Sequence, residues 1–236
     1  MSVPSEPVPV PEIVERIAAG RMVVSVWENE LGGVTFAIGG GAEFVKVYPD
    51  EHAHLLSAEV PRLRWAGRYT PVPRVLASGP GWLHTARLAG RSAVDPRWAD
   101  DPRTAAHAIG DGLRRFHDAL PVDDCPFGRP SWVPGDAPAA DRLVVCHGDA
   151  CSPNTLMADD GAFSGHVDMG DLGVADRWAD LAIATMSLDW NFPTDGPGGF
   201  QEVLLDAYGI AADVDRIAYY REAWDASDDD QDPLAG

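Results

Sequence analysis

Three polar residues that follow two predicted short strands could together carry out phosphoryl transfer. Asp149 lies three residues beyond the apolar run 143–146, and Asn154 follows five residues later. Asp168 stands at the end of another predicted short strand, 163–167. A carboxylate such as Asp149 can orient an acceptor hydroxyl and take its proton. Mg²⁺ ions that bridge phosphates need hard oxygen ligands, which Asn154 and Asp168 would supply. The residue types and their spacing therefore predict phosphoryl transfer, with Asp149 as the catalytic base.

The order His-x-Asp-x₄-Asn, followed by Asp-x-Gly, resembles the catalytic and metal loops of eukaryotic-like kinases. The tripeptide His-Gly-Asp alone would also fit a simple turn after a strand. Longer stretches are more specific, namely CHGDAC at 146–151, FSGHVDMG at 163–170 and LGVADRWADLAIAT at 172–185. These stretches resemble the aminoglycoside O-phosphotransferases, most closely the 3′-type enzymes.

The resemblance implies an α+β, protein-kinase-like fold with two lobes. A small lobe with an antiparallel sheet, residues 1–84, would bind the nucleotide. A hinge at 85–90 would lead to a mainly helical catalytic and substrate lobe, residues 91–236. It further implies that ATP and Mg²⁺ are used to phosphorylate a hydroxyl of an aminoglycoside-like antibiotic, which inactivates the drug.

Two alternatives stay open at this point. The acceptor could be another hydroxylated, cationic metabolite or a peptide antibiotic, and GTP could replace ATP. In a different class, the chain could be a nucleotide-binding pseudokinase. A degenerate site would be expected to lose at least one of the main polar residues, yet all are present: Lys46, Asp149, Asn154 and Asp168.

Lys46 is the residue expected to hold the nucleotide phosphates. It stands on a predicted strand, 43–48, with apolar neighbours on both sides, so its charge needs a partner. The α- and β-phosphates of ATP would provide one. Glu59, thirteen residues later on a predicted helix 51–65, is the natural carboxylate to steady the lysine; the alternative is an exposed glutamate on a surface helix. Pro61 predicts that this helix kinks or restarts.

Two further segments are expected to contact the nucleotide. Gly32 and Gly33 separate two predicted strands and would let backbone amides approach phosphate oxygens, although a plain hairpin turn is the alternative. The segment 82–90 resembles the hinge of the family. By that resemblance Thr85 lies at the back of the adenine pocket, and main-chain hydrogen bonds to adenine come from Ala86 and Leu88.

The acceptor side departs from the family pattern. Only fifteen residues separate Phe127 from Leu143, where the 3′-type enzymes carry a much longer helical insertion, so we expect a more open acceptor site. Asp171 occupies a position that is generally arginine in those enzymes. It would either recruit a substrate ammonium group or pair with Arg177. Asp225 is the one remnant of the acidic cluster that binds the drug amines.

Hydrophobic periodicity predicts the elements that position these residues. Helices are expected at 11–20, 51–65, 102–120, 176–188, 200–208 and 213–224, and strands at 22–27, 34–38, 43–48, 74–77, 81–88, 143–146 and 163–167. On the helix at 176–188, Asp180 is predicted to brace the catalytic loop through hydrogen bonds. His117 is predicted to be a core or helix-terminus histidine rather than a ligand.

Composition narrows the choice of partners and compartment. The chain has 236 residues, with 18 Lys and Arg against 37 Asp and Glu, a formal charge of -19. This charge argues against nucleic acid or an anionic membrane surface as a partner and suits a cationic ligand, or simply solubility. No apolar run approaches the roughly 20 residues of a membrane helix. Three cysteines without a Cys-x-x-Cys spacing indicate reduced thiols, so we expect a cytoplasmic protein. We expect this protein to be a monomer or a weak dimer.

Overall fold

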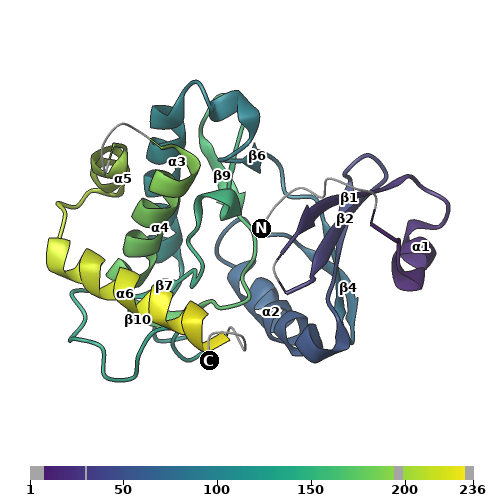
Figure 1. Cartoon of the computed structure of the whole chain (residues 1–236), viewed down its shortest axis with the longest axis horizontal. Coiled ribbons are helices and arrows are strands. Elements are labelled where there is room, and N and C mark those ends of the chain that lie inside the picture. The colour runs from purple at the N-terminus through teal and green to yellow at the C-terminus, as the bar shows by residue number, and fades with distance from the viewer. Residues whose placement is uncertain (1–7, 30, 194–198, 232–236) are drawn as a thin grey trace. The chain divides into compact units, whose positions relative to one another are not determined.

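A computed structural model describes residues 8–29, 31–193 and 199–231, the last four of these by backbone alone. The chain divides into two compact units, Met1–Arg68 with Val72–Leu88 and Tyr69–Pro71 with Ala89–Gly236. One boundary between the units lies between Leu88 and Ala89, and the hinge at 85–90 stays a prediction. The first unit is built on an antiparallel sheet and the second is mainly helical, as the sequence predicted (Figure 1).

The first unit contains a five-stranded antiparallel sheet with the order β1-β2-β3-β5-β4. Its strands are β1 (Val23–Glu28), β2 (Val34–Ile38), β3 (Glu43–Val47), β4 (Val75–Gly79) and β5 (Trp82–Ala86). The helix α1 (Glu12–Ala18) buries Val14 in the same apolar cluster as Phe36 of β2 and Val45 of β3. Lys46 lies opposite Thr35 on β2 and Leu83 on β5, in the middle of the sheet.

The helix α2 (Ala53–Ala66) follows the short 3₁₀ turn η1 (Asp50–His52) and runs without interruption past Pro61. Of the two outcomes predicted at Pro61, a kink or a restart, the continuous helix excludes the restart. Proline removes one backbone donor, and the burial of Leu56, Val60 and Leu63 holds the helix in place around it.

The second unit holds two small antiparallel sheets and the larger helices. One sheet pairs β7 (Leu143–Cys146) with β10 (Gly173–Asp176). The other contains β6 (Arg91–Ser92), β8 (Thr155–Met157) and β9 (Phe163–His166). The 3₁₀ turns are η2 (Pro96–Trp98) and η3 (Ser152–Asn154), and the helices are α3 (Pro102–Ala119), α4 (Arg177–Asn191), α5 (Gln201–Tyr208) and α6 (Val214–Gln231).

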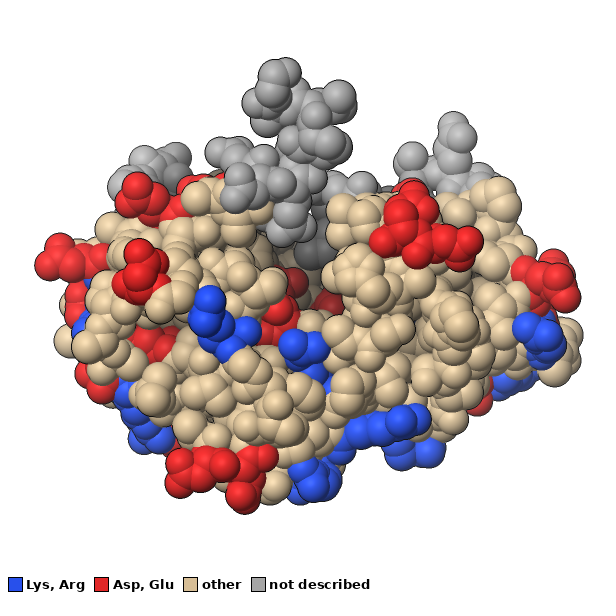
Figure 2. Space-filling model, turned by 90° about the horizontal axis from the view of Figure 1, so that it is seen from below, with Lys and Arg blue, Asp and Glu red and all other residues tan. Residues whose placement is uncertain are grey.

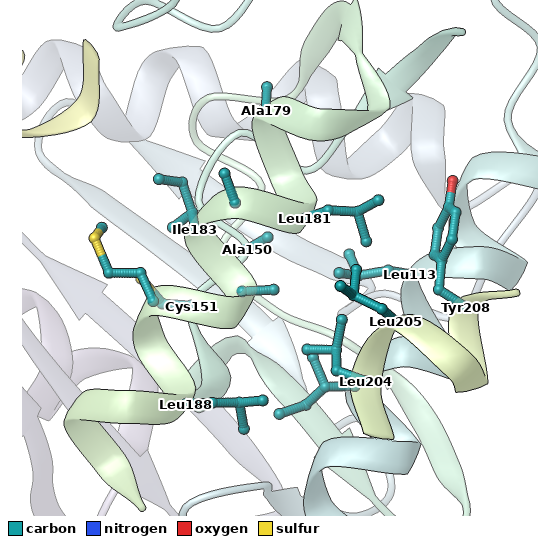
Figure 3. Packing of buried hydrophobic residues seen from close by; sticks show 14 of the residues in the cluster. Leu113, Ala150, Cys151, Ala179, Leu181, Ile183, Leu188, Leu204, Leu205 and Tyr208 are labelled. Carbon is teal, nitrogen blue, oxygen red and sulfur yellow. The ribbon is translucent and has the colours of Figure 1, made fainter. Parts of the chain in front are cut away.

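The helices α3, α4 and α5 bury their apolar faces against one another. Leu113 of α3, Leu181 of α4 and Leu205 of α5 point into the same cluster (Figure 3). The fit is close, because a Cβ on Gly110 would lie 2.1 Å from the carbonyl oxygen of Leu204. This core supports α4, which begins immediately after β10 and carries residues of the site described below.

Charged side chains cover the surfaces of both units. Figure 2 shows carboxylates and basic groups interspersed over the visible part of one face, without one dominant acidic patch. Within the described ranges, no helix is long and apolar enough to cross a membrane.

Candidate active site

The loop that follows β7 is held by one buried carboxylate on α4. The peptide N–H of His147 donates to Asp180 Oδ2 at 2.6 Å, and the N–H of Gly148 donates to Asp180 Oδ1 at 3.0 Å. Asp180 is 1% exposed. Charge-assisted hydrogen bonds of this kind are stronger than neutral ones, so the two residues before Asp149 have a fixed backbone. The prediction that Asp180 braces the catalytic loop is confirmed.

A second layer of buried groups fixes Asp180 itself. His117 Nε2 lies 2.9 Å from Asp180 Oδ2, and His117 Nδ1 lies 2.9 Å from the hydroxyl of Tyr208 on α5. Burial works to raise the pKa of Asp180, but the hydrogen bond and charge of His117, with the loop amide of His147, lower that pKa overall. Asp180 therefore stays an ionised acceptor, and His117 is a core histidine, as predicted.

Asp149 lies at the end of this braced loop, beside Asn154 of η3. The side-chain amide of Asn154 donates to both the backbone oxygen and Oδ2 of Asp149, each at 3.0 Å. The other oxygen, Oδ1, is buried and makes no hydrogen bond within the described part of the chain. Burial raises the pKa of Asp149, as does the nearby carboxylate of Asp168, while His147, Cys151 and Asn154 lower it in part. The Asp149 side chain as a whole is only partly buried, and Asn154 holds it at the end of the loop.

Asp168 follows β9 in a left-handed backbone conformation, with φ of 63°, which is unusual for a residue other than glycine. Val167, the residue before Asp168, is fixed by hydrogen bonds to the catalytic loop. The Val167 N–H donates to the Asn154 carbonyl at 3.0 Å, and the Val167 carbonyl lies 2.9 Å from His147 Nε2. Such strained positions persist only where the surroundings enforce them and are common at functional sites. The structure thus brings Asp149, Asn154 and Asp168 together.

This donor set fits a divalent cation. Repulsion between the Asp149 and Asp168 carboxylates and burial together oppose ionisation of Asp149. A hard cation held by oxygens of Asn154 and Asp168 would offset that repulsion. The oxygen atoms of Asn154 and Asp168 are therefore suited to a hard divalent cation.

His166, the last residue of β9, is a buried residue that sequence reasoning missed. Both of its ring nitrogens are without hydrogen bonds in the described part of the chain. Its ring packs against three others, at centroid distances of 5.1 Å to Phe116, 5.5 Å to His147 and 4.8 Å to Phe163. Burial lowers the pKa of His166 well below its usual value. The sequence signal was a histidine at the end of a predicted strand, 163–167.

In the first unit, Lys46 and Glu59 form the expected ion pair. The Nζ atom of Lys46 lies 3.1 Å from Glu59 Oε2. Glu59 is 4% exposed, so the alternative of an exposed surface glutamate is wrong. A buried carboxylate needs a partner at a fixed position. Lys46 has such a position because it lies on β3, between β2 and β5.

Gly32 and Gly33 form part of a hairpin that satisfies its own amides. The N–H of Gly33 donates to Asn29 Oδ1 at 2.7 Å, and the N–H of Gly32 donates to the Asn29 carbonyl at 3.1 Å. A Cβ on Gly33 would lie 2.7 Å from the ring of Tyr48. The glycine is therefore required by close packing, and amide binding to phosphate stays a prediction that needs these bonds to open.

Thr85 and Ala86 end β5, and Leu88 lies half-buried just beyond the strand. The Ala86 N–H donates to the carbonyl of Arg74 at 2.9 Å. Any hydrogen bond from Ala86 to adenine would therefore use its carbonyl. The adenine contacts of these three residues stay predictions.

Of the two predicted substrate-binding carboxylates, Asp171 contacts Ser131 rather than Arg177. Its oxygens accept hydrogen bonds from the Ser131 N–H, at 2.8 and 2.9 Å, and from the Ser131 hydroxyl, at 3.1 Å. Arg177, one of its two expected partners, donates from Nε to Asp141 at 2.7 Å instead. Asp225 is exposed on α6.

Comparison with known proteins gives a consistent family signal. The phosphotransferase enzyme family profile matches residues 130–220. An aminoglycoside 3′-phosphotransferase from Streptomyces fradiae is 32% identical, over 84% of this chain and 92% of its own length. A streptomycin 3″-kinase from Streptomyces griseus is 30% identical, over 87% of this chain and 92% of its own. The alignment with the S. fradiae enzyme spans 251 positions, more than the 236 residues of this chain, so that relative contains residues without a counterpart here.

Solved structures agree with this result. The aminoglycoside phosphotransferase APH(3″)-Id from Streptomyces rimosus superposes with a TM-score of 0.71 at 28% identity, covering 88% of this chain and 94% of the other. Its complex with ADP and streptomycin superposes with a TM-score of 0.65 at 26% identity, covering 83% and 92%. These matches confirm the α+β, protein-kinase-like fold predicted from the sequence.

Proposed function

Because the chain belongs to the aminoglycoside phosphotransferase family, we propose that it transfers the γ-phosphate of ATP to a hydroxyl group of an aminoglycoside antibiotic. The observation that carries this proposal is the braced loop that places the Asp149 carboxylate beside Asn154 and Asp168. The transferred group adds negative charge to the drug, which would inactivate it. The free cysteines of the described chain fit a reducing cytoplasm, where ATP is available.

The residues of the second unit would act mainly by position. Asp149 would accept a hydrogen bond from the acceptor hydroxyl and align the hydroxyl oxygen for in-line attack on the γ-phosphorus. Because such transition states are loose, alignment and charge neutralisation contribute more than strong base catalysis. Asn154 and Asp168 would hold Mg²⁺, which supplies charge neutralisation to the phosphates when bound.

The residues of the first unit would serve the nucleotide. Lys46, held in place by Glu59, would bind the α- and β-phosphates. Thr85, Ala86 and Leu88 would contact adenine. These roles are supported by the position of Lys46 in the sheet and by the ADP complex of the S. rimosus relative.

A coupled ADP-release assay tests the proposal. With ATP and Mg²⁺, the acceptors tested should include kanamycin, neomycin and streptomycin. The reason is that the two relatives at 32% and 30% identity are named as an aminoglycoside 3′-phosphotransferase and a streptomycin 3″-kinase. We expect acceptor-dependent ADP release that falls by about a hundredfold or more in Asp149→Ala, with ATP affinity nearly unchanged. Wild-type turnover in that variant would contradict the role of Asp149. Silence towards kanamycin, neomycin, streptomycin and hygromycin, with ATP binding shown separately, would contradict the substrate class; viomycin then tests a peptide antibiotic as acceptor.

A further inference from the structure

We propose that residues 128–133, the Trp132 segment, position the catalytic loop, with Trp132 contacting the loop and Asp171 anchoring the segment. The kinetic part of this inference rests on the proposed function, whereas its structural part does not. Trp132 and Asp171 are thereby positioning residues that act through the backbone of Gly148.

The first observation is a buried hydrogen bond to the loop. Trp132 Nε1 donates to the Gly148 carbonyl at 2.6 Å, and Trp132 is 8% exposed. The N–H of Gly148 is already bound to Asp180. The residue directly before Asp149 is therefore held at its N–H from α4 and at its carbonyl from the Trp132 segment. Such two-sided fixation of a reacting group is what positioning requires.

The indole is itself fixed by rings on α6. It meets Trp224 edge to face at a centroid distance of 5.1 Å and Tyr220 at 6.3 Å. Edge-to-face aromatic pairs are favourable beyond their buried area. Trp132 thus links α6 to the catalytic loop, and its donor has a defined direction.

The second observation is the anchor at Asp171. Its carboxylate accepts both the N–H and the hydroxyl of Ser131, the residue next to Trp132. An arginine at position 171 could not do this, because its side chain has no acceptor. A Cβ on Gly148 would lie 2.1 Å from the carbonyl oxygen of Asp171, so the backbones of Gly148 and Asp171 are in close contact.

The start of the segment is tied to β10. The Val174 N–H donates to the Gly128 carbonyl at 2.8 Å. A Cβ on Gly173 would lie 2.3 Å from that same carbonyl oxygen, which leaves no room for a side chain. The Trp132 segment is therefore fixed near both ends, and the short connection between α3 and β7 has a structural task.

Steady-state kinetics of the full chain distinguish this role from ammonium recruitment by Asp171. In Trp132→Phe we expect kcat to fall about tenfold, with KM for both substrates within about twofold of wild type, because alignment rather than binding is lost. Asp171→Ala should give a similar loss of kcat. Asp171→Asn keeps one acceptor oxygen and should lose only about threefold. Trp190→Phe, which changes a 58% exposed tryptophan, is the matched control and should leave kcat unchanged.

Two kinetic outcomes would overturn the proposal. One is an unchanged kcat in folded Trp132→Phe. The other is an equal rise in acceptor KM in Asp171→Asn and Asp171→Ala with unchanged kcat, which would show that the charge of Asp171 binds the substrate.

Hydrogen exchange of the tryptophan indoles tests the anchor without any substrate. The spectrum of Trp132→Phe identifies the Trp132 indole signal in the ¹⁵N-labelled protein. We expect slow exchange of that proton in wild type and Trp190→Phe, and exchange faster by about tenfold in Asp171→Ala. Fast exchange in wild type, or equal protection in Asp171→Ala, would overturn the proposal. If no acceptor is phosphorylated, the proposed function fails while this measurement still decides the anchor.

Discussion

The loop that carries Asp149 and the hairpin that carries Gly33 are held in different ways. The first is fixed by a buried carboxylate on α4, whose own partner is a buried histidine. The second is closed by the side chain of Asn29, four residues away and only partly buried. The loop that carries Asp149 is therefore fixed by buried groups, whereas the predicted phosphate contact of the hairpin would require the bonds to Asn29 to open.

Asp180→Asn should have the largest effect, because it removes the charge on which the catalytic loop depends. Two loop amides and His117 donate to the buried carboxylate. We expect a loss of about 3 kcal/mol in the free energy of unfolding, with a large fall in kcat. Denaturant unfolding measures the first, and Glu222→Gln, an exposed change on α6, is the control. If Asp180→Asn loses no more unfolding free energy than Glu222→Gln, Asp180 does not fix the catalytic loop and the contrast with the hairpin fails.

Glu59→Gln should have the next largest effect and acts on the first unit. The buried glutamate holds Lys46 at 3.1 Å, and the neutral amide would hold the ammonium group less firmly. We expect KM for ATP to rise about tenfold with little change in acceptor KM. Glu51→Gln, at an exposed position of η1, serves as the control. If acceptor KM rises instead, Lys46 does not serve the nucleotide.

His166→Leu should change how stability depends on pH. In the folded protein burial lowers the pKa of His166 well below 6.5, so between that value and 6.5 only the unfolded chain binds the proton. Wild-type stability contributed by the neutral ring is therefore full above pH 6.5 and falls as the pH drops, by up to about 1.4 kcal/mol per pH unit. The variant lacks this loss and should gain on wild type between pH 7.5 and 5.5.

Urea unfolding of both proteins at each pH measures that gain. His107→Gln, at an exposed position on α3, should show no such change relative to wild type. A constant difference between His166→Leu and wild type across the range would mean that His166 takes up a proton in the folded state.

Asn29→Ala should have the smallest effect and sharpens the contrast from the other side. It removes the acceptor for the Leu31 and Gly33 amides and the bond to the Tyr48 hydroxyl. We expect a loss of about 1 kcal/mol or less in stability, because these groups remain close to solvent. We also expect KM for ATP to change less than about threefold, with kcat unchanged. A tenfold loss of kcat would show that the hairpin is as critical as the catalytic loop.

Several parts of the fold were predictable because their signals are local. The apolar faces of α3 and α4 repeat at helical spacing, and β2, β3 and β7 lie within the predicted apolar runs. β10 was missed, because its sequence GVAD includes a glycine and an aspartate and its pairing with β7 joins positions 27 to 33 apart. At Pro61 a local rule was overridden by the burial of α2.

The sequence by itself determined the chemistry of the site. Asp149 and Asn154 are five residues apart, and the short loop that ends in η3 brings their side chains together. Only the tertiary structure decided what holds them. Asp180 contacts the loop across 33 residues, Trp132 across 16, and Asp171 meets Ser131 across 40. Contacts of that range depend on how α4 and the segment before β7 pack, and no spacing in the sequence encodes that packing directly.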